Sequence, residues 1–136
     1  MRLYESISII PNFFNLVYAK NPGGAFGLWA NKSSLFRNIF FNALGGVAII
    51  ILIVIYFDSS YGKLMRLGII FLLGGALGNM IDRIRWRMVV DFLEFYFRSF
   101  RWPAFNVADI AICVGMGLFL LEFFLDSQKK RKKKEG

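Results

Sequence analysis

Three aspartates, Asp82, Asp91 and Asp109, lie in or beside strongly apolar segments and are the first candidates for chemistry. Asp109 interrupts the mostly apolar run Ala104 to Leu125, and a carboxylate inside a membrane span costs about 3 kcal/mol on insertion scales. Because intramembrane ionisable groups more often serve function than structure, we predict a functional role for Asp109. Asp82 directly precedes Arg83 at the end of an expected helix, which favours an ion-pair or capping role for Asp82.

Asp91 interrupts the apolar stretch Val89-Val90-Asp91-Phe92-Leu93, where its carboxylate would be partly desolvated. If Asp91 and Asp109 meet, like charge and low dielectric oppose double ionisation, and the pair holds one proton. Aspartic-protease chemistry requires such a pair: the ionised member takes a proton from water, and the protonated member polarises the scissile carbonyl. The spacing does not show that the two meet. The alternative for Asp109 is an ion pair with one of the arginines at 83, 85 and 87.

Two asparagines accompany these carboxylates at helical spacing. Asn79 lies three residues before Asp82, and Asn106 lies three residues before Asp109. Each amide is therefore expected on the same helix face as its carboxylate, where it can donate an orienting hydrogen bond. A hydrogen bond between helices explains both amides equally well.

The composition excludes several classes of protein. Of 136 residues, 57% are hydrophobic and 19% charged, with a mean hydropathy of +0.52, which argues against a water-soluble enzyme. The chain has no histidine and one cysteine, so histidine-based catalysis, an internal disulfide and His or Cys metal clusters are excluded. The net charge is +8, but six cations form the terminal run Lys129 to Lys134, so nucleic-acid binding is not indicated.

Three segments are long and apolar enough to cross a bilayer, and we expect transmembrane helices over residues 38–57, 64–82 and 103–125. Pro103 suits the first position of the last helix. The segment 83–102 is rich in arginine and aromatic residues and should lie at the membrane interface, outside the cytoplasm.

The topology follows from the positions of the cations. Residues 126–136 form a basic tail directly after a span, which places the C-terminus in the cytoplasm. Residues 1–37 then lie outside with no segment to carry them across, so we expect that this chain lacks an N-terminal span.

Residues 1–34 should contribute extracytoplasmic strands. In Ser6 to Tyr18, apolar residues interrupted by Pro11-Asn12 favour two short strands, and Asn21-Pro22-Gly23-Gly24 favours a turn. The whole chain, residues 1–136, is thus expected to be a single α-helical integral-membrane domain with a small β-sheet.

Two other classes of function remain open. A proton-coupled transporter could relay protons through Asp109 and Asp82, but Ile110 to Leu121 contains no polar side chain except Cys113. A structural subunit could bind a partner helix through Gly74 and Gly78, whose spacing permits close helix packing.

Four motifs stand in order along almost the whole chain: Asn21-Pro22-Gly23-Gly24-Ala25-Phe26-Gly27, Gly74-Gly75-Ala76-Leu77-Gly78-Asn79-Met80-Ile81-Asp82-Arg83, Val89-Val90-Asp91-Phe92 and Phe105-Asn106-Val107-Ala108-Asp109. In this order and approximate spacing they resemble the motifs of the bacterial lipoprotein signal peptidases, also called signal peptidase II. Any one motif would be a weak signal, whereas four in register are specific.

The resemblance implies an aspartyl endopeptidase of the bacterial inner membrane, with its active site towards the periplasm, that cuts prolipoproteins before the diacylglyceryl-modified cysteine. By the family pattern Asp91 and Asp109 form the catalytic pair, and no metal or other cofactor is used. The matching supporting or substrate-binding positions are Asn21, Gly23, Asn79, Asp82, Arg83 and Asn106. The implied partners are prolipoproteins and membrane lipid, with globomycin-type cyclic peptides as inhibitors, and we expect a monomer.

The fold implied by the resemblance has four transmembrane helices, three of them in this chain, with a small extracytoplasmic β-sheet cradle and an interfacial helix. The chain departs from the family pattern in two places. Family members begin with a further membrane helix that carries an Asp and a Lys near its outer end, and this helix has no counterpart here. Gly24 replaces a usual alanine, which should loosen the turn without removing a catalytic group.

Overall fold

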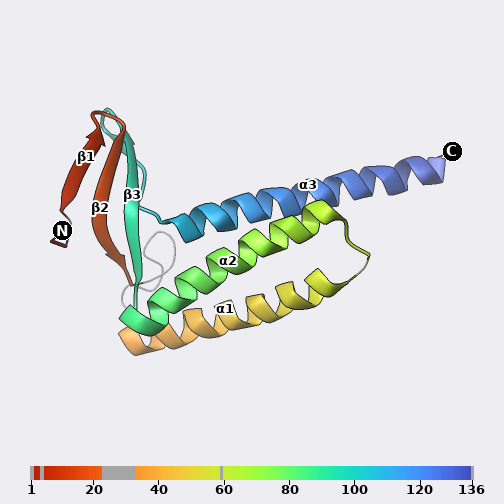
Figure 1. Ribbon diagram of the computed structural model, residues 1–136, viewed down its shortest axis with the longest axis horizontal. Coiled ribbons are helices and arrows are strands. Elements are labelled where there is room, and N and C mark those ends of the chain that lie inside the picture. The colour runs from red at the N-terminus through yellow and green to blue at the C-terminus, as the bar shows by residue number, and fades with distance from the viewer. Residues whose placement is uncertain (1, 4, 23–32, 59, 136) are drawn as a thin grey trace. The chain divides into compact units, whose positions relative to one another are not determined.

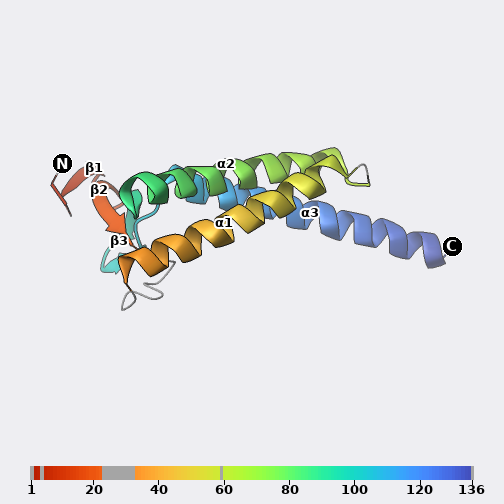
Figure 2. The same cartoon turned by 90° about the horizontal axis from the view of Figure 1, so that it is seen from below.

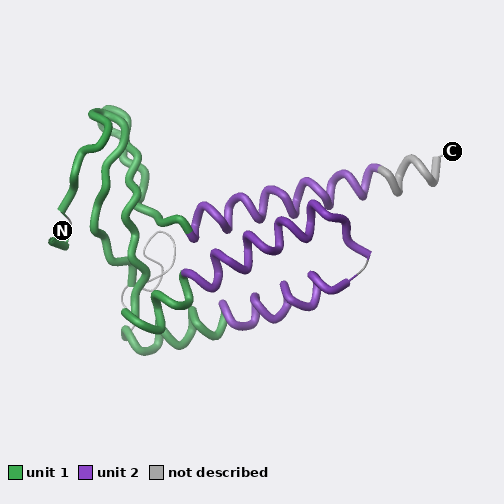
Figure 3. Tube along the Cα trace, viewed as in Figure 1, with its two compact units in different colours: residues 1–44, 79–107 green, residues 45–78, 108–136 purple. Residues whose placement is uncertain are grey.

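The computed structural model describes residues 2–3, 5–22, 33–58 and 60–135, with side chains described up to residue 128. These ranges form three helices and four strands in the order β1, β2, α1, α2, β3, β4, α3 (Figures 1 and 2). They group into two compact units, Met1–Leu44 with Asn79–Val107 and Gly45–Gly78 with Ala108–Gly136 (Figure 3). The first unit contains the sheet, and the second contains most of the helical length.

The sheet of the first unit is antiparallel, with the strand order β1-β2-β3-β4. Its strands are β1 (Ser6–Ile10), β2 (Phe14–Asn21), β3 (Val89–Phe97) and β4 (Phe100–Arg101). The two N-terminal strands and the break between them are confirmed. At the break Asn12 has a φ of 60°, a left-handed conformation that asparagine tolerates better than most residues.

The expected interfacial segment, residues 83–102, is divided among several elements. The first four belong to helix α2, most of the others belong to β3 and β4, and no separate interfacial helix occurs among the described residues. Val89, Val90 and the aromatic residues of β3 are the types that favour strands, so the aromatic composition that suits a membrane interface also suits a sheet.

A polar contact inside the sheet joins β2, β3 and β4. Asn15, only 5% exposed, donates a 2.8 Å hydrogen bond from Nδ2 to Glu94 Oε2, and Asn15 faces Glu94 across the β2–β3 pair. The Arg101 guanidinium forms an ion pair with the same oxygen at 3.0 Å. Since a buried amide needs hydrogen-bond partners, this contact fixes which residues lie opposite each other.

The helices are α1 (Ser34–Phe57), α2 (Lys63–Trp86) and α3 (Val107–Glu135). Segments long and apolar enough to span a membrane are Ser34–Phe57, Lys63–Trp86 and Val107–Gln128, which confirms the three expected spans. The first begins with an N-cap, because Ser33 Oγ accepts a 3.2 Å hydrogen bond from the Phe36 backbone N–H.

Several helix limits differ from those expected. α1 begins at Ser34 rather than at residue 38, and α3 continues to Glu135 rather than ending at residue 125. α2 continues four residues past the expected end, so that Asp82 and Arg83 lie inside its last two turns. The prediction that Pro103 starts the last helix is wrong, because α3 begins at Val107. Residues 103–106 instead stay outside the helix, where Phe105 forms a bridge with Leu93 of β3.

In the second unit α2 and α3 pack through glycines. A Cβ added at Gly68 would lie 2.8 Å from the Gly115 carbonyl oxygen, and one added at Gly115 would lie 2.6 Å from the Gly68 carbonyl oxygen. The backbones therefore approach closely at this point. Gly78 contributes a further contact with Ala108, whereas a Cβ at Gly74 would meet no described atom within 4 Å. Within the described part of the chain, Gly74 therefore makes no close helix contact of this kind.

Candidate functional site

The first candidate carboxylate, Asp91, is buried in the sheet. Asp91 is the third residue of β3, is only 4% exposed, and lies opposite Ala19 of β2. Residues two apart on a strand point to the same face, so Asp91 shares its face with Val89, which is 3% exposed. A carboxylate placed this way needs hydrogen-bond donors, because an unpartnered buried charge is strongly destabilising.

Asn106 supplies such a donor. Its side chain is 4% exposed, and its Nδ2 lies 2.9 Å from Asp91 Oδ1 and 3.1 Å from Asn79 Oδ1. An amide nitrogen has two hydrogens, so it can serve both acceptors. The three side chains, called here the amide–carboxylate cluster, join α2, β3 and the residue that precedes α3.

The backbone around Asn106 explains how it is held. Phe105 donates a 3.0 Å hydrogen bond to the Leu93 carbonyl and accepts one of 2.9 Å from the Leu93 N–H. This bridge keeps residues 103–106 extended beside β3 and stops the helix from starting at Pro103. Asn106 then stands directly before the first residue of α3, a position that asparagine favours.

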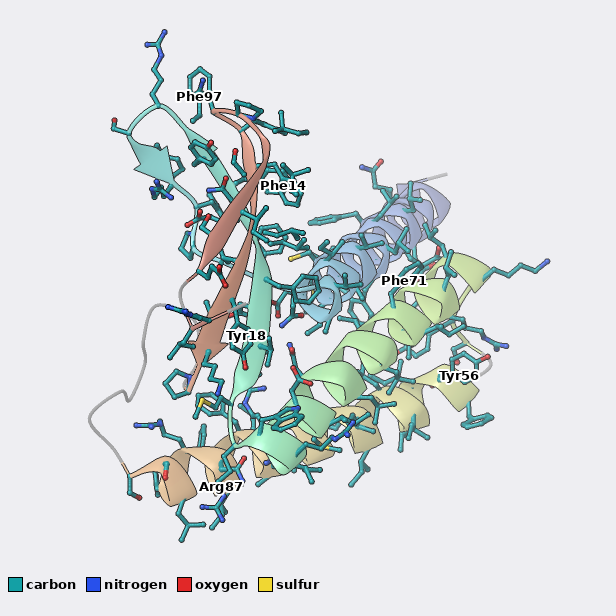
Figure 4. All side chains as sticks on the ribbon, turned by 60° about the vertical axis from the view of Figure 1, so that its left-hand side comes forward. Phe14, Tyr18, Tyr56, Phe71, Arg87 and Phe97 are labelled. Atoms are coloured by element: carbon teal, nitrogen blue, oxygen red, sulfur yellow. The ribbon has the colours of Figure 1, made fainter. Side chains whose placement is uncertain are left out.

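Asp82 and Arg83 support the connection from α2 to β3. Asp82 Oδ2 accepts a 3.1 Å hydrogen bond from the backbone N–H of Val90, the residue next to Asp91. The Arg83 guanidinium lies 5.0 Å from the centre of the Phe41 ring, a cation–π distance. Between α2 and β3, Arg87 has a φ of 57°, which turns the chain from helix into strand. Figure 4 labels Arg87 at this turn. Asp82 thus holds the start of β3 through this hydrogen bond.

The remaining predicted residues lie elsewhere. Asn21 ends β2 opposite Val89, two residues from Asp91 along β3, whereas Gly23 lies outside the described residues. Asp109 is half-buried in the first turn of α3, three residues after Asn106, and belongs to the second compact unit. The pairing of Asp91 with Asp109 therefore stays a prediction.

Sequence reasoning missed the main contact of Asn106. For each amide we considered a bond to the carboxylate three residues later and, equally, a bond between helices. Asn106 donates to Asp91 and Asn79, which are 15 and 27 residues away. Asn106 is not inside a helix, so helical spacing does not apply to it. In the described part of the chain no three His, Cys, Asp or Glu side chains gather in a way that could hold a metal ion.

The three spans and the buried amide–carboxylate cluster define an integral membrane protein with a polar site where α2, β3 and α3 connect. Comparison with known proteins gives its family. A sequence profile described as Signal peptidase (SPase) II matches residues 1–125. Among curated relatives, the lipoprotein signal peptidase of Syntrophotalea carbinolica is 44% identical over 127 residues, covering 93% of this chain and 78% of that protein.

Other relatives agree. The lipoprotein signal peptidase of Desulforapulum autotrophicum is 47% identical over 119 residues, covering 87% of this chain and 74% of that protein. A solved bacterial membrane enzyme, determined by the in meso method at 2.3 Å resolution, has a TM-score of 0.84 and 30% identity, covering 96% of this chain and 77% of that one.

The chain therefore belongs to the signal peptidase II family, as the four motifs predicted, and is a membrane-embedded protease. Family membership takes the place of the transporter and scaffold interpretations.

Proposed function

We propose that this chain is an aspartic endopeptidase that removes signal peptides from diacylglyceryl-modified prolipoproteins, with Asp91 and Asp109 as the catalytic pair. The observation that carries the proposal is the hydrogen bond from Asn106 to the buried Asp91. Asn106 directly precedes the helix whose first turn contains Asp109, so one short segment links the two carboxylates. The family's name supplies the substrate class.

In this mechanism the pair holds one proton and acts on one water molecule. The ionised carboxylate takes a proton from water as the water oxygen bonds to the scissile carbonyl carbon, and the protonated carboxyl gives its proton to the carbonyl oxygen. As the tetrahedral intermediate collapses, the C–N bond breaks, the leaving amine receives a proton from the pair, and one hydroxyl group of the intermediate returns its proton to the pair. The Asn106 amide cannot supply that proton; it orients Asp91 while the proton moves.

The lipid of the substrate should dominate its binding, because each buried CH₂ contributes about 0.8 kcal/mol. We expect a prolipoprotein whose lipobox cysteine is replaced by serine, and which carries no diacylglyceryl group, to be cleaved at least about 100-fold more slowly. Mass spectrometry of both products, in detergent, gives the rate and the cleaved bond. Equal turnover of the two precursors would contradict lipid-directed binding, and cleavage at another bond would contradict the proposed function itself.

The proposed setting is the bacterial inner membrane, with the C-terminus in the cytoplasm. Dense positive charge supports this orientation, since Lys63 and Arg66 lie in the first turn of α2, next to the short loop that follows α1, and the run Lys129 to Lys134 follows the last span. The active site then faces the periplasm. We further propose that the enzyme works as a monomer and is inhibited by globomycin-type peptides.

Replacing Asn106 with alanine should slow cleavage about 100-fold, since small misplacements of a catalytic group cost that much. The change removes the donor shared by Asp91 and Asn79 and should also lower the stability by about 1–3 kcal/mol, because buried acceptors lose a partner. The readouts are kcat/KM and the thermal midpoint in detergent.

The matched control is Asn42→Ala, which removes an amide whose Nδ2 donates to Asn38 of the same helix, α1. This variant should keep its kcat/KM within about twofold. An Asn106→Ala protein that is as active as the Asn42→Ala protein would show that Asn106 does not position Asp91.

A further inference from the structure

The turn between β3 and β4 carries exposed aromatic rings and arginines. Phe97, Phe100 and Trp102 are 65%, 64% and 57% exposed, and Arg98 and Arg101 are exposed beside them. Figure 4 labels Phe97 at this end of β3, opposite the end where Arg87 lies. We call these five residues the hairpin surface. Rings this large are rarely so exposed together unless the surface contacts something other than water.

The hairpin surface borders an apolar pocket of about 260 Å³. Its lining is aromatic throughout: Phe13, Phe95, Tyr96, Phe97, Phe100, Trp102 and Phe105. All of these residues belong to the first compact unit, so the pocket is complete within that unit. Such a lining offers contact to hydrocarbon and provides few hydrogen-bonding groups for a polar ligand.

Arg98 occupies a backbone position that favours glycine. Phe97 pairs with Phe100, so Arg98 and Ser99 form a two-residue hairpin loop, and Arg98 has a φ of 56°. A positive φ at the first loop residue is the geometry for which glycine is preferred. The backbone of Arg98 is strained here. Its side chain places a cation at the tip of the β3–β4 hairpin, with Cζ 5.4 Å from the centre of the Phe97 ring.

The charge of the hairpin surface comes mainly from Arg98. Arg101 is paired with Glu94 at 3.0 Å and is largely neutralised by it. Arg98 and Arg101 together with Glu94 therefore leave one positive charge, located at the tip of an aromatic surface. Aromatic rings with an adjacent cation are typical of protein segments that lie among lipid headgroups.

The chain also keeps the hairpin surface close to a membrane span. Trp102 lies five residues before Val107, where α3 and its span Val107–Gln128 begin, and five residues reach at most about 18 Å. The Phe105 bridge to Leu93 ties β3 to this connection. A bilayer is therefore always within reach of the surface, whereas a soluble partner would have to be recruited.

We propose that the hairpin surface docks on anionic phospholipid, with its rings among the headgroups and upper acyl chains and Arg98 against a lipid phosphate. The apolar pocket fits the hydrocarbon next to that phosphate, and the single cation selects anionic over zwitterionic lipid. This inference does not depend on the proposed catalytic pair, and its test does not measure cleavage.

The test uses Trp102 as a reporter of the lipids around it. Trp29 and Trp86 are changed to phenylalanine, which leaves Trp102 as the only tryptophan of the three in the chain. The protein is placed in vesicles of equimolar phosphatidylcholine and phosphatidylglycerol, with bromine on the acyl chains of one lipid or the other. We expect brominated phosphatidylglycerol to quench Trp102 more, with a local enrichment of about fivefold.

The excess quenching is the amount by which brominated phosphatidylglycerol quenches Trp102 more than brominated phosphatidylcholine does, and Arg98→Gly should remove it. Glycine readily adopts the positive φ at this position, so the hairpin should remain folded. Arg98→Lys should keep the excess. The matched control is Arg87→Gly, which removes the same charge at a φ of 57° at the other end of β3 and should also keep it. Equal quenching by both lipids in the parent protein, no quenching by either, or an unchanged excess in Arg98→Gly would each overturn the proposal.

Discussion

Replacing Asp91 or Asp109 with asparagine should abolish cleavage of a diacylglyceryl-modified prolipoprotein while leaving the protein folded. Asparagine has nearly the same shape as aspartate, and its carbonyl oxygen at position 91 can still accept the hydrogen bond from Asn106. It cannot take a proton from water or give one to the carbonyl. Because proton transfer by a positioned side chain contributes about 10²–10⁴-fold, we expect kcat/KM to fall at least about 1,000-fold in each variant.

The control for this loss is Asp58→Asn. Asp58 lies in the exposed loop after α1, where the Ser60 backbone N–H bonds to its carboxylate at 2.8 Å and lowers its pKa. Its replacement should leave cleavage unchanged within about twofold. Retention of a tenth or more of the parent activity by Asp91→Asn or Asp109→Asn, with folding confirmed by circular dichroism, would remove that residue from the catalytic pair.

Gly75→Ala should also have a large effect, because α2 and α3 touch there. A Cβ at Gly75 would overlap the Ala108 carbonyl oxygen and lie 2.6 Å from Ile112 Cγ1. The backbone of α3 has to move to make room, and overpacking of this kind costs about 1–3 kcal/mol. Ala108 precedes Asp109, so the shift should also misplace that carboxylate and lower kcat/KM by about 100-fold.

Gly74 provides the neighbouring control. A Cβ at Gly74 would meet no described atom within 4 Å, and alanine is a better helix former than glycine by about 1 kcal/mol. Gly74→Ala should therefore raise or preserve the thermal midpoint and preserve activity. If Gly74→Ala and Gly75→Ala behave alike, the close approach of α2 and α3 at Gly75 would be wrong.

Much of the fold could be predicted because the lipid bilayer imposes length and composition on each span. The three helices and the first two strands follow from apolar runs and from the break at Pro11-Asn12. The start of α3 could not be predicted, because Pro103 is well suited to begin a helix. The competing bridge between Phe105 and Leu93 is a tertiary contact, which local sequence does not reveal.

The sequence indicates which residues are candidates for the site, but it does not reveal which of them contact one another. Carboxylates and amides in apolar surroundings identify Asp91 and Asn106 as unusual wherever they lie in the chain. Their hydrogen bond depends on a strand and a loop coming together, and no periodicity relates residues 91 and 106. Helical spacing related Asn106 to Asp109, but Asn106 lies before α3 rather than inside it.

The measurement that tests the catalytic pair most directly compares Asp91→Asn, Asp109→Asn and the double variant with the same lipidated precursor. Residues that act as a unit show losses that do not multiply, because the first replacement already disables the step. We predict that the double variant cleaves about as slowly as the slower single variant. A double variant whose loss equals the product of the two single losses would mean that Asp91 and Asp109 act independently, and would contradict a shared water and a shared proton.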